Sequence, residues 1–215
     1  MDLIEQINAV RRTVAKRQVK TGPDGLSTGR SIAVAQSYDA TIEDVWDACT
    51  NPERLVRWFA PVSGELKLGG RYAIEGNASG TVERCDPPKS FALTWEYDGD
   101  TSWVEVKLTA EANGTRFELE HTMPVNDHWE LYGPGAGGVG WDLSLASLAA
   151  HLAEKPLPPE EEWTTTPEGV EFMRGSSSRW GEAGIAGGED PEWAQAAADR
   201  TTAAYTETTD GNDQQ

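Results

Sequence analysis

Apolar and polar residues alternate along the middle of the chain. In residues 90–97 an apolar side chain takes every second position, with Phe91, Leu93 and Trp95 on one side. A period of two is typical of strands that bury one face. Turn sequences such as Gly69-Gly70 and Asn113-Gly114 separate the runs. The pattern therefore predicts an antiparallel sheet of six or seven strands, formed by residues 31–38, 64–68, 71–75, 80–85, 90–97, 102–109 and 115–123.

Helical spacing replaces this alternation at both ends of the chain. Leu3, Ile7, Val10 and Val14 recur every three or four residues, which predicts an amphipathic N-terminal helix over residues 1–19. From Gly140 to Ala153 an apolar stripe that includes Trp141 and Leu145 predicts a longer helix. A helix after a series of hairpins favours an α+β fold, with the helix laid across one face of the sheet.

Residues 41–59 interrupt the strands with two short helices. Thr41 can cap the first helix, and Asn51 can cap the second, with Pro52 at its first helical position. Trp46 shares the apolar face of the first helix, so we expect it to be buried against the sheet.

The C-terminal quarter differs in composition from the sheet region. Residues 154–166 are rich in proline and glutamate and are expected to be a linker. Residues 167–206 predict a helical extension that packs on the main domain, residues 28–153, or on a second subunit in a homodimer. Residues 207–215 are expected to be a disordered tail.

Composition narrows the classes of partner and the compartment. The net charge of −18 disfavours nucleic acid as a partner. An apolar segment of about 18 residues is absent, so we expect neither export nor membrane insertion. The two cysteines, Cys49 and Cys85, have no paired spacing and indicate a reduced, cytoplasmic protein.

Motifs of catalysis and cofactor binding give little support to an enzyme. Residues 135–140 fit G-x-G-x-x-G, but Pro134 precedes them and no βαβ unit surrounds them, so a loop at a cavity entrance is the preferred interpretation. His121, His128 and His151 match no metal motif, and no nucleophile motif is present. We expect no metal and no cofactor, and the catalytic residues, if any, are unknown.

The segment from Tyr38 to Phe59, with Pro61-Val62 and Gly69-Gly70-Arg71-Tyr72 after it, resembles a known family. It is similar to the start of the SRPBCC or START-like superfamily, in the branch of activators of heat-shock protein 90 ATPase homologues. The resemblance implies a helix-grip fold, in which a curved sheet surrounds a long C-terminal helix with an apolar cavity between them. Members of the superfamily include lipid carriers, polyketide cyclases and a chaperone activator, so the resemblance leaves the function open.

Three functions follow from this resemblance. The first is binding of a small hydrophobic or amphipathic ligand, the second is a chaperone-associated or other protein-binding module, and the third is an enzyme similar to polyketide cyclases. His121 is either a core histidine or a polar group for the ligand, and in the third case it would transfer protons. The expected ligand-binding residues are Trp58 and Phe59 at the mouth, Trp95, Phe117, Leu119, Trp141 and Leu145 on the wall, and Tyr72 and His121 as hydrogen-bonding groups.

Overall fold

The computed structural model describes residues 3–21, 25–155 and 157–206. The strands are β1 (Arg11–Thr21), β2 (Gly25–Tyr38), β3 (Val62–Gly64), β4 (Arg71–Ile74), β5 (Ser79–Asp86), β6 (Ser90–Tyr97), β7 (Asp100–Glu111) and β8 (Gly114–Pro124). The helices are α1 (Leu3–Ala9), α2 (Ile42–Thr50), α3 (Pro52–Leu55), α4 (Asp127–Tyr132), α5 (Gly135–Leu152), α6 (Glu160–Trp163), α7 (Pro167–Ala186) and α8 (Pro191–Thr206).

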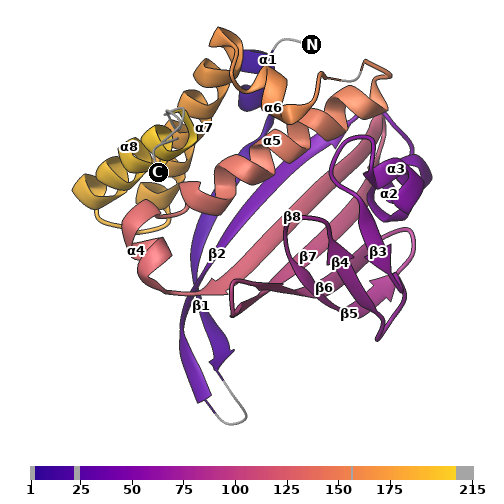
Figure 1. Cartoon of the computed structure of the whole chain (residues 1–215), viewed down its shortest axis with the longest axis horizontal. Coiled ribbons are helices and arrows are strands. Elements are labelled where there is room, and N and C mark those ends of the chain that lie inside the picture. Colours follow the sequence, from indigo (N-terminus) through magenta and orange to yellow (C-terminus); the bar gives the residue numbers. More distant parts are fainter. Residues whose placement is uncertain (1–2, 22–24, 156, 207–215) are drawn as a thin grey trace, which may run out of the picture.

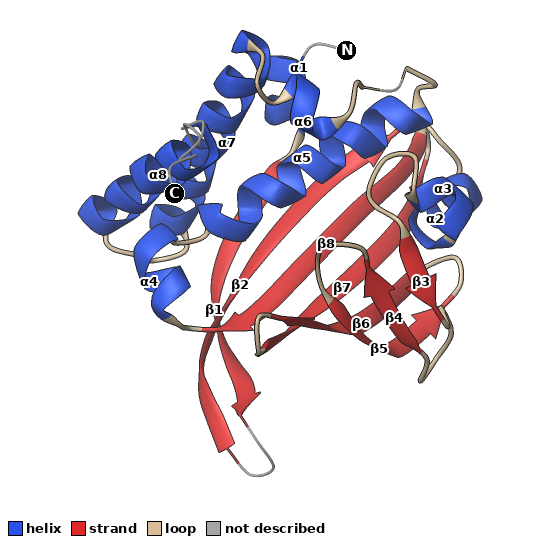
Figure 2. Cartoon of the chain, viewed as in Figure 1, coloured by secondary structure: helices blue, strands red, loops and turns tan. Residues whose placement is uncertain are grey.

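One antiparallel sheet and one long helix form the centre of the molecule. The strand order is β1-β2-β8-β7-β6-β5-β4-β3. The sheet curves, and α5 crosses one of its faces (Figure 1; Figure 2). This arrangement confirms the predicted α+β helix-grip fold, although the sheet has eight strands. No helix among the described residues is long and apolar enough to cross a membrane.

The additional strand is β1, and it corrects the helix predicted over residues 1–19. Helix α1 ends at Ala9, and every residue from Arg11 to Thr21 pairs with a residue of β2. The helical spacing continued to Val14 by coincidence, whereas β-branched residues such as Val14 and Val19 also suit a strand. Both valines are buried. Strand β2 follows β1 directly in a hairpin, with Thr21 paired to Gly25, and the periodicity of residues 3–14 alone does not report this pairing.

Residues 135–140 begin helix α5 and are not a loop, so the predicted entrance loop is wrong. The glycines allow neighbouring elements to approach the helix closely. A Cβ atom at Gly138 would lie 2.3 Å from Cε2 of Trp180, and one at Gly135 would lie 3.1 Å from Thr201. The run therefore serves packing between α5 and the C-terminal helices, which compensates for the low helix propensity of glycine.

The C-terminal extension packs on its own chain. Helices α7 and α8 lie beside α5, on the side away from α2 and α3 (Figure 1). Trp180 of α7 is completely buried. The predicted linker, residues 154–166, is wrong in part, because it contains α6, whose Trp163 is buried with its ring centroid 5.6 Å from that of Phe172. The predicted tail, 207–215, lies outside the described residues.

Replacing Gly138 with alanine tests whether the glycine run serves helix packing. The new methyl group would overlap the Trp180 ring, so we expect Gly138→Ala to lower the free energy of unfolding by about 1–3 kcal/mol. The matched control is Gly140→Ala, where the nearest atom, Oη of Tyr205, would be 3.6 Å away. Alanine should stabilise that position by up to ~1 kcal/mol through its helix propensity. Urea denaturation of the three proteins measures both changes, and equal stabilities of the two variants would contradict the packing role.

Candidate functional site

An apolar cavity of about 310 Å³ lies between the sheet, helix α5 and the pair α2 and α3. The caps predicted for this pair are confirmed, since Thr41 Oγ1 accepts from the Asp44 N–H (3.3 Å) and Asn51 Oδ1 from the Glu53 N–H (3.0 Å). These caps fix where each short helix begins. The chain then turns at Trp58 and Phe59, and both side chains line the cavity.

Eight of the nine residues expected at a ligand site line this cavity. They come from five separate parts of the chain, which the fold brings together: Trp58, Phe59, Tyr72, Trp95, Phe117, Leu119, Trp141 and Leu145. His121 does not line it. The period-two pattern of the strands placed Trp95, Phe117 and Leu119 on the inner face of the sheet, because alternate side chains of a strand share a face.

Several lining residues were not predicted at the site. Trp46 was expected in the core, but it is half-buried, contacts Phe91 edge-on with ring centroids 5.9 Å apart, and lines the cavity. Val45, its neighbour, and Ala48 are the completely buried residues of α2. Cys49 and Cys85 also line the cavity. Burial raises the pKa of the Cys49 thiol to about 12, so this thiol stays protonated at neutral pH.

Hydrogen bonds within the protein occupy most polar groups of the cavity wall. Burial raises the pKa of Tyr72, so its hydroxyl stays protonated and donates a hydrogen bond. The bonds to backbone carbonyls run from Thr50 Oγ1 to Trp46 (2.7 Å), Trp58 Nε1 to Ala48 (3.0 Å), Tyr72 Oη to Thr94 (2.7 Å) and Ser144 Oγ to Gly140 (2.9 Å).

Charged groups are absent from the described residues that line the cavity, and so is histidine. The described parts of the chain also contain no group of three or more His, Cys, Asp or Glu side chains arranged to hold a metal ion. The geometry therefore offers surface for an apolar molecule and no recognisable acid and base pair.

The comparisons with known proteins agree with this fold and cavity. Residues 39–153 match the family described as Activator of Hsp90 ATPase homolog 1-like protein. The chain belongs to this family. It is the branch of the SRPBCC or START-like superfamily that the sequence resembled, so that prediction is confirmed. A search of curated proteins found no match.

Several solved structures are similar to this chain. The crystal structure of CalU16 from Micromonospora echinospora is 35% identical, covers 81% of this chain and 98% of its own, and has a TM-score of 0.66. The solution structure of CalU16 covers 83% of this chain and 97% of its own, with 34% identity and a TM-score of 0.70. DynU16, a putative protein in the dynemicin biosynthetic locus, is 22% identical, covers 59% of this chain and 48% of its own, and has a TM-score of 0.54, which supports the fold alone.

In this family member His121 lies behind two aromatic residues of the cavity wall. Trp141 Nε1 donates to His121 Nδ1 (3.2 Å), and His121 Nε2 is 2.8 Å from Ser102 Oγ. The imidazole is therefore neutral, with its proton on Nε2, and donates to Ser102. Ser102 in turn donates to the Trp95 carbonyl (3.2 Å). Burial lowers the pKa of His121 to about 4. These contacts favour the core histidine over the ligand-binding alternative.

The substitution His121→Phe tests the structural role. It leaves the Trp141 N–H without its acceptor, so we expect a loss of about 1–3 kcal/mol in the free energy of unfolding at pH 7. It should also change the pH dependence. In the wild type the unfolded state binds a proton near pH ~6.5 and the folded state only near pH 4, so stability falls as the pH falls through this window.

The variant should lack this part of the pH dependence, as urea denaturation at pH 7 and pH 5 would measure. His128→Phe, at an exposed position of α4, is the control. A His121→Phe protein with wild-type stability at both pH values would contradict the core assignment.

Proposed function

We propose that the protein binds a neutral, largely apolar molecule with aromatic rings in the cavity between sheet and α5, and that it does so without a chemical reaction. The observation that carries this proposal is the composition of the wall. Eight lining residues are aromatic, none is charged, and the polar ones named above are engaged within the protein. Family membership is compatible with this function and leaves the ligand unspecified.

The absence of charge from the wall determines which ligands fit. A carboxylate or ammonium group would lose its water shell in the cavity and would find no opposite charge among the lining residues. An apolar ring system loses nothing comparable, because it gains contact with side chains such as Trp46, Phe91 and Trp95. Aromatic pairs also favour edge-to-face packing, as Trp46 and Phe91 already show.

The two alternative functions receive less support. A cyclase-like reaction would require a proton-transfer group at the ligand, and His121 has both ring nitrogens engaged away from the cavity. Binding to a chaperone is supported by the family description alone. It stays a prediction, and a pull-down with a purified Hsp90-type chaperone would test it.

Two fluorescent probes with the same ring system and different charge test the proposal. N-phenyl-1-naphthylamine is neutral, and 1-anilinonaphthalene-8-sulfonate carries one added sulfonate group, with its negative charge, on the same rings. We expect the neutral probe to bind at least about tenfold more tightly, since the sulfonate would be buried without a partner. Fluorescence titration measures both dissociation constants.

A substitution that fills the cavity tests whether the probe binds there. Ser144 of α5 lines the cavity, so Ser144→Phe should fill part of it and weaken binding of the neutral probe by about tenfold or more. Ser178→Phe makes the same change at an exposed position of α7 and should leave binding unchanged. Equal affinities of the two variants, or tighter binding of the sulfonate, would contradict the proposal.

A further inference from the structure

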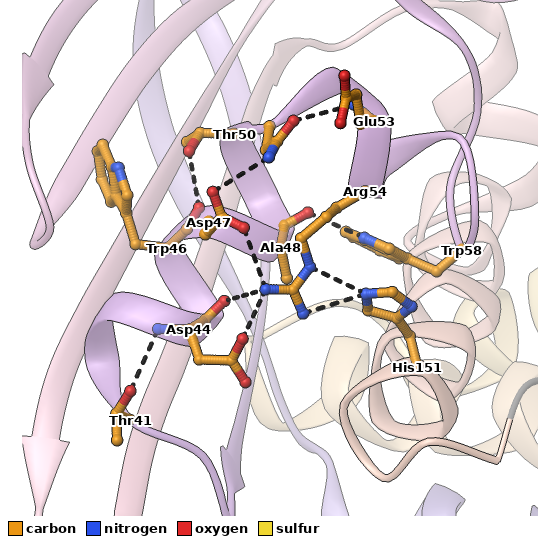
Figure 3. Close-up of polar contacts among 11 residues, drawn as sticks. Thr41, Asp44, Trp46, Asp47, Ala48, Thr50, Glu53, Arg54, Trp58 and His151 are labelled. Carbon is orange, nitrogen blue, oxygen red and sulfur yellow. Dashed lines mark hydrogen bonds and ion pairs between the residues drawn. The ribbon is translucent and has the colours of Figure 1, made fainter.

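Arg54 of helix α3 connects three helices beside the cavity (Figure 3). Its Nη1 donates to Asp44 Oδ1 (2.5 Å) and to Asp47 Oδ2 (3.2 Å), both on α2. Its Nε and Nη2 point to Nε2 of His151 at the end of α5, at 3.2 and 3.1 Å. The arginine side chain is 20% exposed, so these contacts are partly shielded from water.

The contact between Arg54 and His151 requires a neutral histidine. A guanidinium group has donors only and does not lose its proton in proteins. His151 Nε2 must therefore accept, which places the ring proton on Nδ1. If His151 gains a second proton, Nε2 becomes a donor and the ring becomes a cation beside Arg54. The hydrogen bond is then lost, and repulsion between like charges replaces it.

This contact fastens one wall of the cavity to another. Helices α2 and α3 with the turn to Phe59, residues 42–59, together form one wall of the cavity. This segment is called the cap, as distinct from the capping residues of the individual helices. The cap lines the cavity with side chains that include Trp46, Leu55 and Phe59, while α5 contributes Trp141 and Leu145. Arg54 holds the two helices of the cap together through the α2 carboxylates, and His151 is its contact on α5.

We infer that His151 is a pH-sensitive fastener, whose protonation releases the cap from α5 and speeds exchange of the ligand in the cavity. The part that concerns the ligand rests on the proposed function. The release of the cap rests on the contact geometry alone. Arg54 stays bound to Asp44 and Asp47 after release, so the cap would move as one unit.

The charged groups that act on His151 set the direction of its titration. Burial is the largest effect and lowers its pKa, and the positive charges of Arg54 and Arg57 lower it further, while Asp44 raises it. Asp47 forms an ion pair with Arg54. The fastener is thus closed at neutral pH and opens in acid, below the ordinary histidine value of about 6.5.

Kinetics of probe release test the fastener. Stopped-flow dilution of bound N-phenyl-1-naphthylamine gives the release rate between pH 7.5 and pH 5. We expect the wild-type release rate to rise about tenfold as the pH falls over this range, because one charge-assisted hydrogen bond is lost. His151→Gln keeps an acceptor for Arg54 and cannot titrate, so its rate should stay slow and flat. His151→Leu removes the acceptor, so its rate should be fast at every pH.

A control variant shows whether the effect is specific to His151. His128→Gln, at an exposed position of α4, should behave as the wild type does. His121 is present in all variants, so its titration cancels in the comparison. Equal pH dependence in the wild type and His151→Gln would overturn the inference.

Hydrogen exchange of the cap amides needs no ligand. After correction for intrinsic rates, acid should speed exchange of residues 42–59 in the wild type and not in His151→Gln. If the neutral probe does not bind, the proposed function fails, and this exchange experiment alone decides the fastener. Identical exchange in the two proteins would then overturn it.

Discussion

One buried carboxylate joins strand β1, helix α5 and helix α7. Oδ2 of Asp142, in the middle of α5, accepts from Arg12 Nε of β1 (2.8 Å), from Ser176 Oγ of α7 and from Trp180 Nε1 of α7 (3.1 Å). Burial raises the pKa of Asp142, and the arginine and the hydrogen bonds oppose that effect. A buried ion pair is costly to form, and removal of one partner would leave the other charge buried and unpaired. The cluster connects α5 and the extension to the strand at the sheet edge.

The Asp142 cluster also explains why α5 differs from an ordinary surface helix. One side of α5 lines the cavity through Trp141 and Leu145, and the other side is covered by α7. The extension is therefore part of the domain's structure, because it buries a side of α5 that would otherwise face water. The crystal structure of CalU16 covers 81% of this chain, whereas the family model matches residues 39–153 alone. The similarity to CalU16 therefore extends beyond those residues. Helix α5 is the wall of the cavity that packs extensively on α7, and the cap is the wall that makes fewer contacts with the rest of the chain.

Local sequence patterns correctly predicted the strands that bury one face and expose the other. The strands that line the cavity repeat every second residue, so Trp95, Phe117 and Leu119 could be placed on the inner face from the sequence. The same method failed where a partner outside the segment decides the structure. The pairing with β2 that makes β1 a strand lies in the hairpin that follows, and the Trp180 ring that explains Gly138 comes from a later helix. A helix period or a glycine run contains no information about such partners.

His121 and Asp142 show a second limit of sequence reasoning. Each is a polar residue in an apolar stretch, and such a residue marks either a ligand site or an internal hydrogen-bond cluster. The difference depends on the number of internal partners, which only the structure supplies. His121 has Trp141 and Ser102, and Asp142 has Arg12, Ser176 and Trp180.

For the proposed ligand site, the hydrogen bonds inside the cavity wall favour selectivity by exclusion of polar groups. Trp58, Tyr72 and Ser144 could each have bound a polar ligand, but each donates to a nearby carbonyl. A ligand that competed for these donors would first have to break a hydrogen bond within the protein, which is worth about 0.5–1.5 kcal/mol. An apolar ligand disturbs none of them. A site built in this way discriminates strongly against charge and weakly among apolar shapes of similar size, because a missing methylene group costs little and a buried charge costs much. The surface of the protein, with its net charge of −18, can then stay fully hydrated while the cavity remains neutral.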